Sequence, residues 1–126
     1  MNALCAAERR SDPAELIAVA RAAAKVCLKQ PLINAEAHGR LLLAGAAALV
    51  GDKDTAVREL RRVIPIFERC EMAGYLAASQ RRLAALVGGD EGRALTRLAD
   101  VWIGAEGIVR PDRYTHMMTP GFGPQV

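Results

Sequence analysis

The side chains that most often catalyse reactions or bind metals are few in this sequence. His38 and His116 are its only histidines, and neither has a cysteine or carboxylate at the spacing of a metal-ligand set. The motifs that position groups for phosphoryl transfer, such as His-Arg-Asp and Asp-Phe-Gly, are absent from the sequence. We therefore predict a protein that is not an enzyme and that holds no cofactor and no metal.

The cysteines and the longest apolar stretch bear on where the protein resides. Cys5, Cys27 and Cys70 are odd in number and widely spaced, which argues against a disulfide framework. We interpret them as reduced thiols of a cytoplasmic protein. The longest apolar stretch, residues 41–50, is about half the length that a bilayer requires. We therefore expect no membrane span.

A glycine-rich stretch, Gly-Gly-Asp-Glu-Gly at residues 88–92, precedes a predicted helix. Backbone N–H groups at the N-terminus of a helix can bind phosphate. No Lys-Ser or Lys-Thr pair follows this stretch, and its two carboxylates would repel an anion. We interpret residues 88–92 as a turn between helices.

Arginines are the largest set of side chains that could bind a charged partner: Arg58, Arg61, Arg62, Arg81, Arg93 and Arg97. Such a basic strip is typical of nucleic-acid or phosphopeptide binding. However, aromatic residues are not interleaved with it, and Glu59, Glu91 and Asp100 dilute its charge. We favour a solvated helix face, so nucleic acid is not the expected partner, and binding through the strip is the alternative.

The elements that must position these residues are helices. The chain has 126 residues, of which 52% are hydrophobic and only 4% aromatic, and Ala and Leu, which fill most of the difference, are strong helix formers. A chain of this length forms one domain. We predict an all-α fold with a disordered segment at residues 1–11, antiparallel helical hairpins at residues 12–110, and a C-terminal cap and tail at residues 111–126.

Capping residues, glycines and prolines set the predicted helix boundaries. Three of the predicted helices span residues 13–29, 31–50 and 75–87. The third helix begins at Asp52 or Asp54, the fifth at Asp90, and a short sixth at Pro111. Pro65 lies inside the third helix and should kink or split it, because it removes one backbone hydrogen bond.

The sequence contains a short internal repeat. Three apolar residues of the third helix recur about 38 residues later in the fifth helix. Ala56, Leu60 and Val63 correspond to Ala94, Leu98 and Val101. We expect each alanine to let two helices approach closely and each leucine to fill the space between them. These spacings resemble the second half of a tetratricopeptide repeat (TPR), although the Trp and Tyr of its first helix are absent. We therefore predict five helices and a short C-terminal one, stacked as a short, degenerate TPR-like array.

A second resemblance covers residues 67–122. It rests on residues 67–75 (Phe-Glu-Arg-Cys-Glu-Met-Ala-Gly-Tyr), on residues 99–102 (Ala-Asp-Val-Trp), and on residues 120–122 (Pro-Gly-Phe). These motifs resemble the C-terminal helical-repeat tail of large bacterial serine/threonine protein kinases that also carry an ATPase module. The resemblance implies a regulatory or scaffolding role in bacterial signalling, and no catalysis, because the kinase motifs are missing here.

Helix geometry predicts a surface for a partner. If the second and fourth helices line a concave face, the 3.6-residue period brings four side chains onto it: His38, Leu41, Tyr75 and Arg82. We prefer Tyr75 and Arg82 as contacts, because Tyr and Arg dominate the binding energy of many interfaces. The alternative for Tyr75 is packing against the third helix near Pro65.

These observations favour a non-catalytic module that binds a protein or peptide, or that holds a regulatory assembly together. The chain supplies roughly two and a half repeat units, fewer than the three that such arrays usually need. Its exposed ends therefore make a homodimer a second option. Nucleic-acid or phosphopeptide binding through the arginine strip is the alternative function.

Overall fold

The structure, a computed structural model, describes residues 14–122. Six helices and no strand make up this part of the chain, which confirms the predicted all-α class. They are α2 (Ala14–Leu28), α3 (Ile33–Leu49), α4 (Lys53–Arg69), α5 (Ala73–Val87), α6 (Gly89–Ala105) and α7 (Pro111–Met118). None of these helices is long and apolar enough to cross a membrane. The predicted disordered segment at residues 1–11 and the last four residues of the tail lie outside the described residues.

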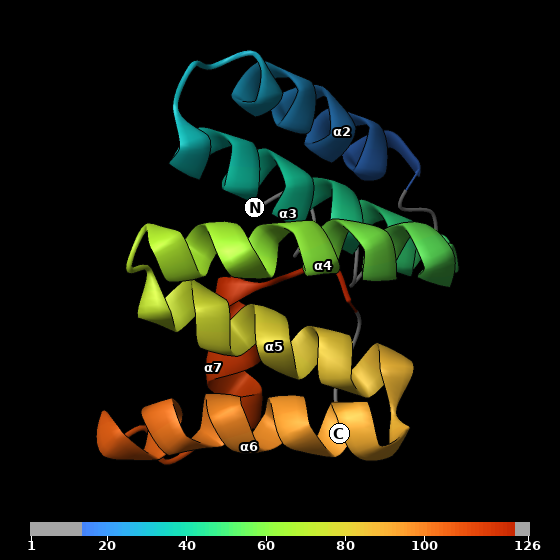
Figure 1. Cartoon of the computed structure of the whole chain (residues 1–126). Helices are drawn as coiled ribbons and strands as arrows, with labels where there is room; N and C mark the ends of the chain where they lie inside the picture. Colours follow the sequence, from blue (N-terminus) through green and yellow to red (C-terminus); the bar gives the residue numbers. More distant parts are fainter. Residues whose placement is uncertain (1–13, 123–126) are drawn as a thin grey trace.

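Helices α2 to α6 lie one after another in a stack (Figure 1). Each of them packs against the next helix along the chain, and the short connections make neighbouring helices antiparallel. The short α7 crosses behind the stack in this view and packs against α5. The architecture is therefore one of stacked helical hairpins.

Local sequence explains where several helices begin and end. Asp52 caps α4 by accepting a hydrogen bond from the backbone N–H of Thr55 at 3.2 Å, and hydrogen bonding to Thr55 lowers the pKa of Asp52. Before it, Gly51 has a φ of +82°, a value that favours glycine. The sequence predicts that Asp90 begins α6. The helix instead begins at Gly89, and Asp90 lies in its first turn.

Pro65 does not split α4, which runs unbroken from Lys53 to Arg69. Its ring lies on the exposed side of the helix, where water can satisfy the carbonyl group that loses its partner. The apolar stripe on the opposite side is therefore continuous, and Leu60 and Val63 within it are 0% exposed.

The largest apolar cluster joins the three central helices. Leu41 from α3, Leu60 and Phe67 from α4, and Leu83 from α5 are at most 2% exposed and belong to this central core cluster. A smaller cluster joins α2 to α3, and another surrounds Ile103 where α6 meets α5. The core therefore extends along the stack from one end to the other.

The repeated residues pack differently in α4 and α6. Ala94 is exposed, and Leu98 and Val101 are 62% and 75% exposed. The expectation that Ala94 and Leu98 pack between helices is therefore wrong. The physical reason is that α6 is the last helix of the stack and packs substantially against only α5 among the described helices.

α6 makes its close approach to α5 at a different residue. A Cβ atom added to Gly92 would lie 2.8 Å from the carbonyl oxygen of Ala84, a distance that real side chains do not tolerate. Ala99 and Ile103, two and three turns further along the same side, are at most 1% exposed. Glycine and small or branched residues on this side therefore decide which face of α6 is buried.

Candidate partner-binding site

His38 and Tyr75, two of the four predicted contact residues, lie side by side in an aromatic cluster. Their ring centroids are 4.7 Å apart in an edge-to-face arrangement, and Phe67 of α4 stacks on Tyr75 at 5.4 Å. Burial lowers the pKa of His38, which favours its neutral form. Tyr75 thus packs against α4, the alternative that the sequence left open, although both side chains remain partly exposed.

Leu41 and Arg82, the other two, are buried, which contradicts the exposure that helix geometry predicts for them. Each is 1% exposed. Their helices, α3 and α5, lie inside the stack with a neighbour on both sides, so more of each helix is covered than an open concave face would allow. Leu41 lies in the central core cluster.

Arg82 binds the C-terminal segment of its own chain. Its Nε donates to the hydroxyl of Thr119 and one Nη donates to the carbonyl oxygen of Thr119, both at 2.9 Å. Its guanidinium also lies 5.0 Å from the ring centroid of Phe122, a cation–π distance. Because Phe122 packs on the central core cluster, residues 119–122 contact the side of the stack where the sequence predicts a partner.

The sequence predicts a C-terminal cap at residues 111–126, but it does not predict that Arg82 binds this segment. Thr119 and Pro120 are buried, and Thr119 also donates a hydrogen bond to the carbonyl oxygen of Thr115 in α7. The available signal is Phe122, one of the few aromatic residues of the chain, which follows a Pro-Gly pair. Such a residue is more often packed than exposed.

The six arginines of the predicted basic strip divide into two sets. One set lies on the exposed side of α4: Arg58, Arg61 and Arg62. The other set lines a cleft between α5, α6 and α7: Arg81, Arg93 and Arg97. In the first set, Arg61 makes a bidentate ion pair with Glu91 at 2.6 and 2.9 Å. Its hydrogen bonds raise the pKa of Arg61 and lower the pKa of Glu91, so this arginine already has a partner.

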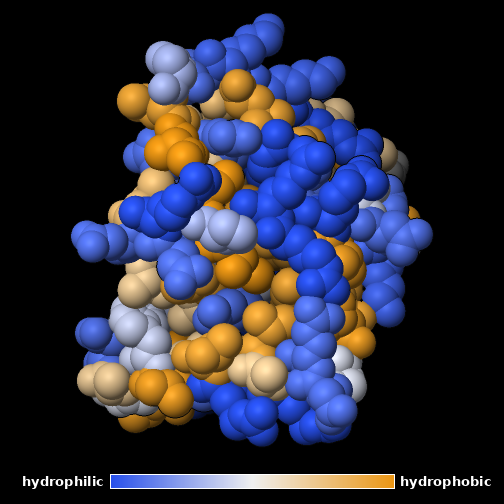
Figure 2. All heavy atoms as spheres, viewed as in Figure 1, coloured by the Kyte–Doolittle hydropathy of each residue, from blue (hydrophilic) through white to orange (hydrophobic). Residues whose placement is uncertain are grey.

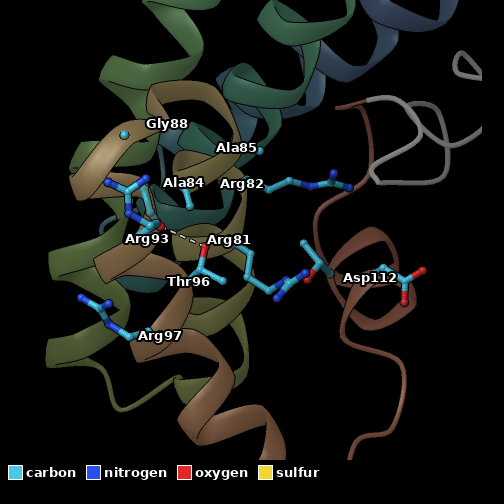
Figure 3. A pocket seen from close by; sticks show the side chains of 12 residues that line it. Arg81, Arg82, Ala84, Ala85, Gly88, Arg93, Thr96, Arg97 and Asp112 are labelled. Carbon is cyan, nitrogen blue, oxygen red and sulfur yellow. Dashed lines mark hydrogen bonds between the residues drawn. The ribbon is translucent and has the colours of Figure 1, made fainter.

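The arginine-lined cleft has a volume of about 570 Å³, and Figure 3 shows it with α5 and α6 on one side and α7 on the other. Arg82 lines it together with the second arginine set, and Asp112 of α7 is the carboxylate in its lining. Arg81 forms an ion pair with Asp100 at 2.5 Å. Arg93 forms an ion pair with Asp90, and Arg97 makes no ion pair with any described residue.

The outer face of α6 carries an apolar stripe that none of the described residues covers. It consists of four exposed residues at helical spacing: Ala94, Leu98, Val101 and Ala105. α2, at the other end of the stack, carries a similar stripe: Val19, Ala22, Ala23 and Val26. On the face shown in Figure 2, hydrophobic atoms likewise lie exposed between hydrophilic ones along the stack. Exposed stripes of this kind are typical of surfaces that associate.

Comparison of the chain with protein-family models, with curated proteins and with solved structures finds no match. The likeness to a tetratricopeptide repeat and the likeness to a kinase tail therefore stay predictions from the sequence. Within residues 14–122, no group of three His, Cys, Asp or Glu side chains could hold a metal ion.

Proposed function

We propose that the chain is a non-catalytic interaction and scaffolding module that binds a second helical chain through the outer face of α6. The observation that supports this most is the exposure of Leu98 and Val101, at 62% and 75%, when the same sequence pattern is buried in α4. A regulatory assembly in bacterial signalling, which the resemblance to a kinase tail implies, would use such a module.

The energetics of the α6 stripe favour association. Burying one exposed leucine or valine side chain is worth roughly 1.5–3 kcal/mol. Ala94 and Ala105, at the two ends of the stripe, are small enough to let a partner helix approach closely. Single exposed apolar residues are ordinary, but an apolar stripe along one helix face is the pattern of an interface.

A second copy of the chain is the partner that the structure supports best. α2 and α6 lie at the two ends of the stack, and each carries an exposed apolar stripe. Stacking α6 of one copy on α2 of the next would cover both apolar stripes.

Light scattering across a range of concentrations tests this proposal. The wild-type chain should associate as its concentration rises, and Leu98→Glu combined with Val101→Glu should stay monomeric, because a buried unpaired charge is costly. Val109→Glu is the matched control, since Val109 is 87% exposed outside the stripe. A wild-type chain that is monomeric throughout, or association that survives the double change, would contradict the proposal.

A second pair of substitutions identifies which faces meet. Val19→Glu combined with Val26→Glu places two charges on the stripe of α2. If α6 stacks on α2, this variant should also fail to associate. If it instead forms a stable dimer, then α6 pairs with α6 around a two-fold axis.

Binding through the arginine strip remains the alternative function, with less support. Arg61 and Arg81 each have a carboxylate partner, and the six arginines do not form a single set. An affinity for nucleic acid or phosphopeptide that falls steeply with salt would favour this alternative.

A further inference from the structure

The C-terminal segment, residues 119–122, lies on the stack in the way that a bound peptide does. Its backbone is irregular, and it follows α7. In Figure 1 it is the red segment that passes behind the stack at the level of α4 and α5. Thr119 and Phe122 anchor it through contacts with Arg82 and with the central core cluster. Peptides bind to folded domains in the same manner, through a few anchoring side chains.

Thr119 supplies the polar part of this contact. Its hydroxyl and its carbonyl oxygen accept hydrogen bonds from Nε and one Nη of Arg82, both at 2.9 Å, and Figure 3 shows the Arg82 side chain extending from α5 toward this segment. Pro120 keeps Thr119 out of the helical conformation, at φ −133° and ψ 69°. Arg82 is 1% exposed, and a guanidinium buried to this degree is stable only when it is hydrogen-bonded. Arg82 therefore favours a ligand that offers a hydroxyl and a carbonyl group together.

Phe122 supplies the apolar part of the contact. Its ring centroid lies 5.0 Å from the guanidinium carbon of Arg82, and the side chain packs against the central core cluster. Pro120 and Gly121, between the two anchoring residues, are buried. A cationic group beside an apolar surface suits an aromatic side chain, which gains from both burial and the cation–π contact. The segment therefore combines a hydroxyl residue with an aromatic residue three positions later.

The core of the stack is formed without this segment. The buried members of the central core cluster all belong to α3, α4 and α5: Ala37, Leu41, Ala44, Leu60, Val63, Ile66, Phe67 and Leu83. Phe122 joins this cluster from outside as a partly buried residue. Among the described helices, α7, which precedes the segment, packs substantially against α5 alone. An irregular segment with few contacts opens at a lower free energy than the helices of a core, so another peptide can replace it.

We propose that Arg82 and the adjoining surface of the central core cluster form a peptide-binding site, which residues 119–122 occupy as an internal ligand. The partner is an extended protein segment with Thr or Ser in the place of Thr119 and an aromatic residue in the place of Phe122. The internal segment competes with this partner at an effective concentration on the order of millimolar, so it closes the site to weak ligands. The site and the apolar stripe of α6 consist of different residues, so either proposal can fail without the other.

Fluorescence anisotropy with a labelled synthetic peptide of residues 115–126 tests the site on the full chain. The Phe122→Ala chain should bind this peptide saturably and at least about tenfold more tightly than the wild-type chain does, because its own segment competes less well. Met117→Ala is the matched control, since Met117 of α7 is 66% exposed. This control chain should bind the peptide with an affinity within about twofold of the wild-type value.

Changes in the peptide show which groups the site recognises, and they leave the chain itself unaltered. On the Phe122→Ala chain, the peptide change Phe122→Ala should weaken binding about tenfold, and the peptide change Thr119→Val should weaken it several-fold. Adding Arg82→Met to the chain should abolish saturable binding while circular dichroism shows the wild-type helix content. Equal affinities of the three peptides, or binding that survives Arg82→Met, would overturn the proposal.

Nuclear magnetic resonance of the wild-type chain keeps the test valid if Phe122→Ala does not fold. Unlabelled peptide at millimolar concentration should partly displace the internal segment of the isotope-labelled chain. The amide signals of Gly121 and Phe122 should then move toward their positions in the free peptide. Signals that do not move would overturn the proposal and show that residues 119–122 are a fixed part of the fold. A folded Phe122→Ala chain that does not bind the peptide saturably would overturn it as well.

Discussion

The apolar stripes of α4 and α6 share one spacing but differ in burial. Leu60 and Val63 are 0% exposed, whereas Leu98 and Val101 are 62% and 75% exposed. α4 has a helix packed on both sides, and α6 packs substantially against only α5 within residues 14–122. Helical periodicity thus shows that a face is apolar, and the place of the helix in the stack decides whether the same chain covers it.

The sharpest test of this comparison is one substitution made in both stripes. Leu60→Ala should lower the free energy of unfolding by about 2–5 kcal/mol, because it leaves a cavity in a closely packed core. Leu98→Ala should lower it by about 0.5 kcal/mol or less in the monomer, because the side chain is already exposed. Urea unfolding of dilute protein, followed by circular dichroism, measures both. Equal costs would show that the stripe of α6 is covered within the monomer.

A second test concerns Arg82 of α5, which residues 119–122 contact and bury. Arg82→Met removes both hydrogen bonds to buried Thr119, which should cost about 1–3 kcal/mol of stability. The same change at Arg81, whose ion pair is partly exposed, should cost less than about 1 kcal/mol. Amide hydrogen exchange should become faster at Thr119, Gly121 and Phe122 only in Arg82→Met, since Pro120 has no amide hydrogen. Unchanged exchange there would mean that Arg82 does not hold the segment in place.

Most of the fold could be predicted from the sequence, because helix boundaries depend on local residues. The predicted helix at residues 31–50 is observed as Ile33–Leu49, and the one at residues 75–87 as Ala73–Val87. Turn glycines such as Gly51 mark these ends through their backbone conformation alone.

The candidate site could not be predicted, because it depends on contacts between distant residues. The spacing of Arg82 indicates an exposed residue, but residues 119–122 return to it across α5. The spacing of Leu98 indicates a core residue, but no described helix packs on that side of α6. Likewise, the arginine-lined cleft exists only because α6 and α7 both pack against α5.

A third prediction contrasts the buried and exposed sides of α6 with two glycines. Gly92→Ala should destabilise the chain by about 1–2 kcal/mol, because the new Cβ would lie 2.8 Å from a backbone oxygen of α5 and the helices must move apart. Gly104→Ala meets no atom within 4 Å and should stabilise the helix by about 0.5–1 kcal/mol. Thermal unfolding of both variants measures the difference in sign. Stabilisation by both would show that α6 does not approach α5 closely at Gly92.

The smallest effect that we predict is a pH dependence on the covered side of α4. His38 lies against Phe67 and Tyr75, and burial lowers its pKa below the ordinary value of 6.5. In the pH range between the two pKa values, the unfolded chain binds more protons at this residue than the folded chain does. The free energy of unfolding should therefore fall as the pH is lowered through 6.5, until the folded-state pKa is passed.

Urea unfolding at three pH values, roughly 7.5, 6.5 and 5.5, tests this prediction, because most carboxylates remain ionised in that range. The wild-type chain should lose stability as the pH falls, whereas His38→Gln should lose markedly less, since glutamine does not titrate. A wild-type chain that is equally stable at all three values, or a variant with the same loss, would contradict it. Either result would mean that water reaches the aromatic cluster between α3, α4 and α5. The surface of α4 near His38 would then be less completely buried than Leu60, which is 0% exposed.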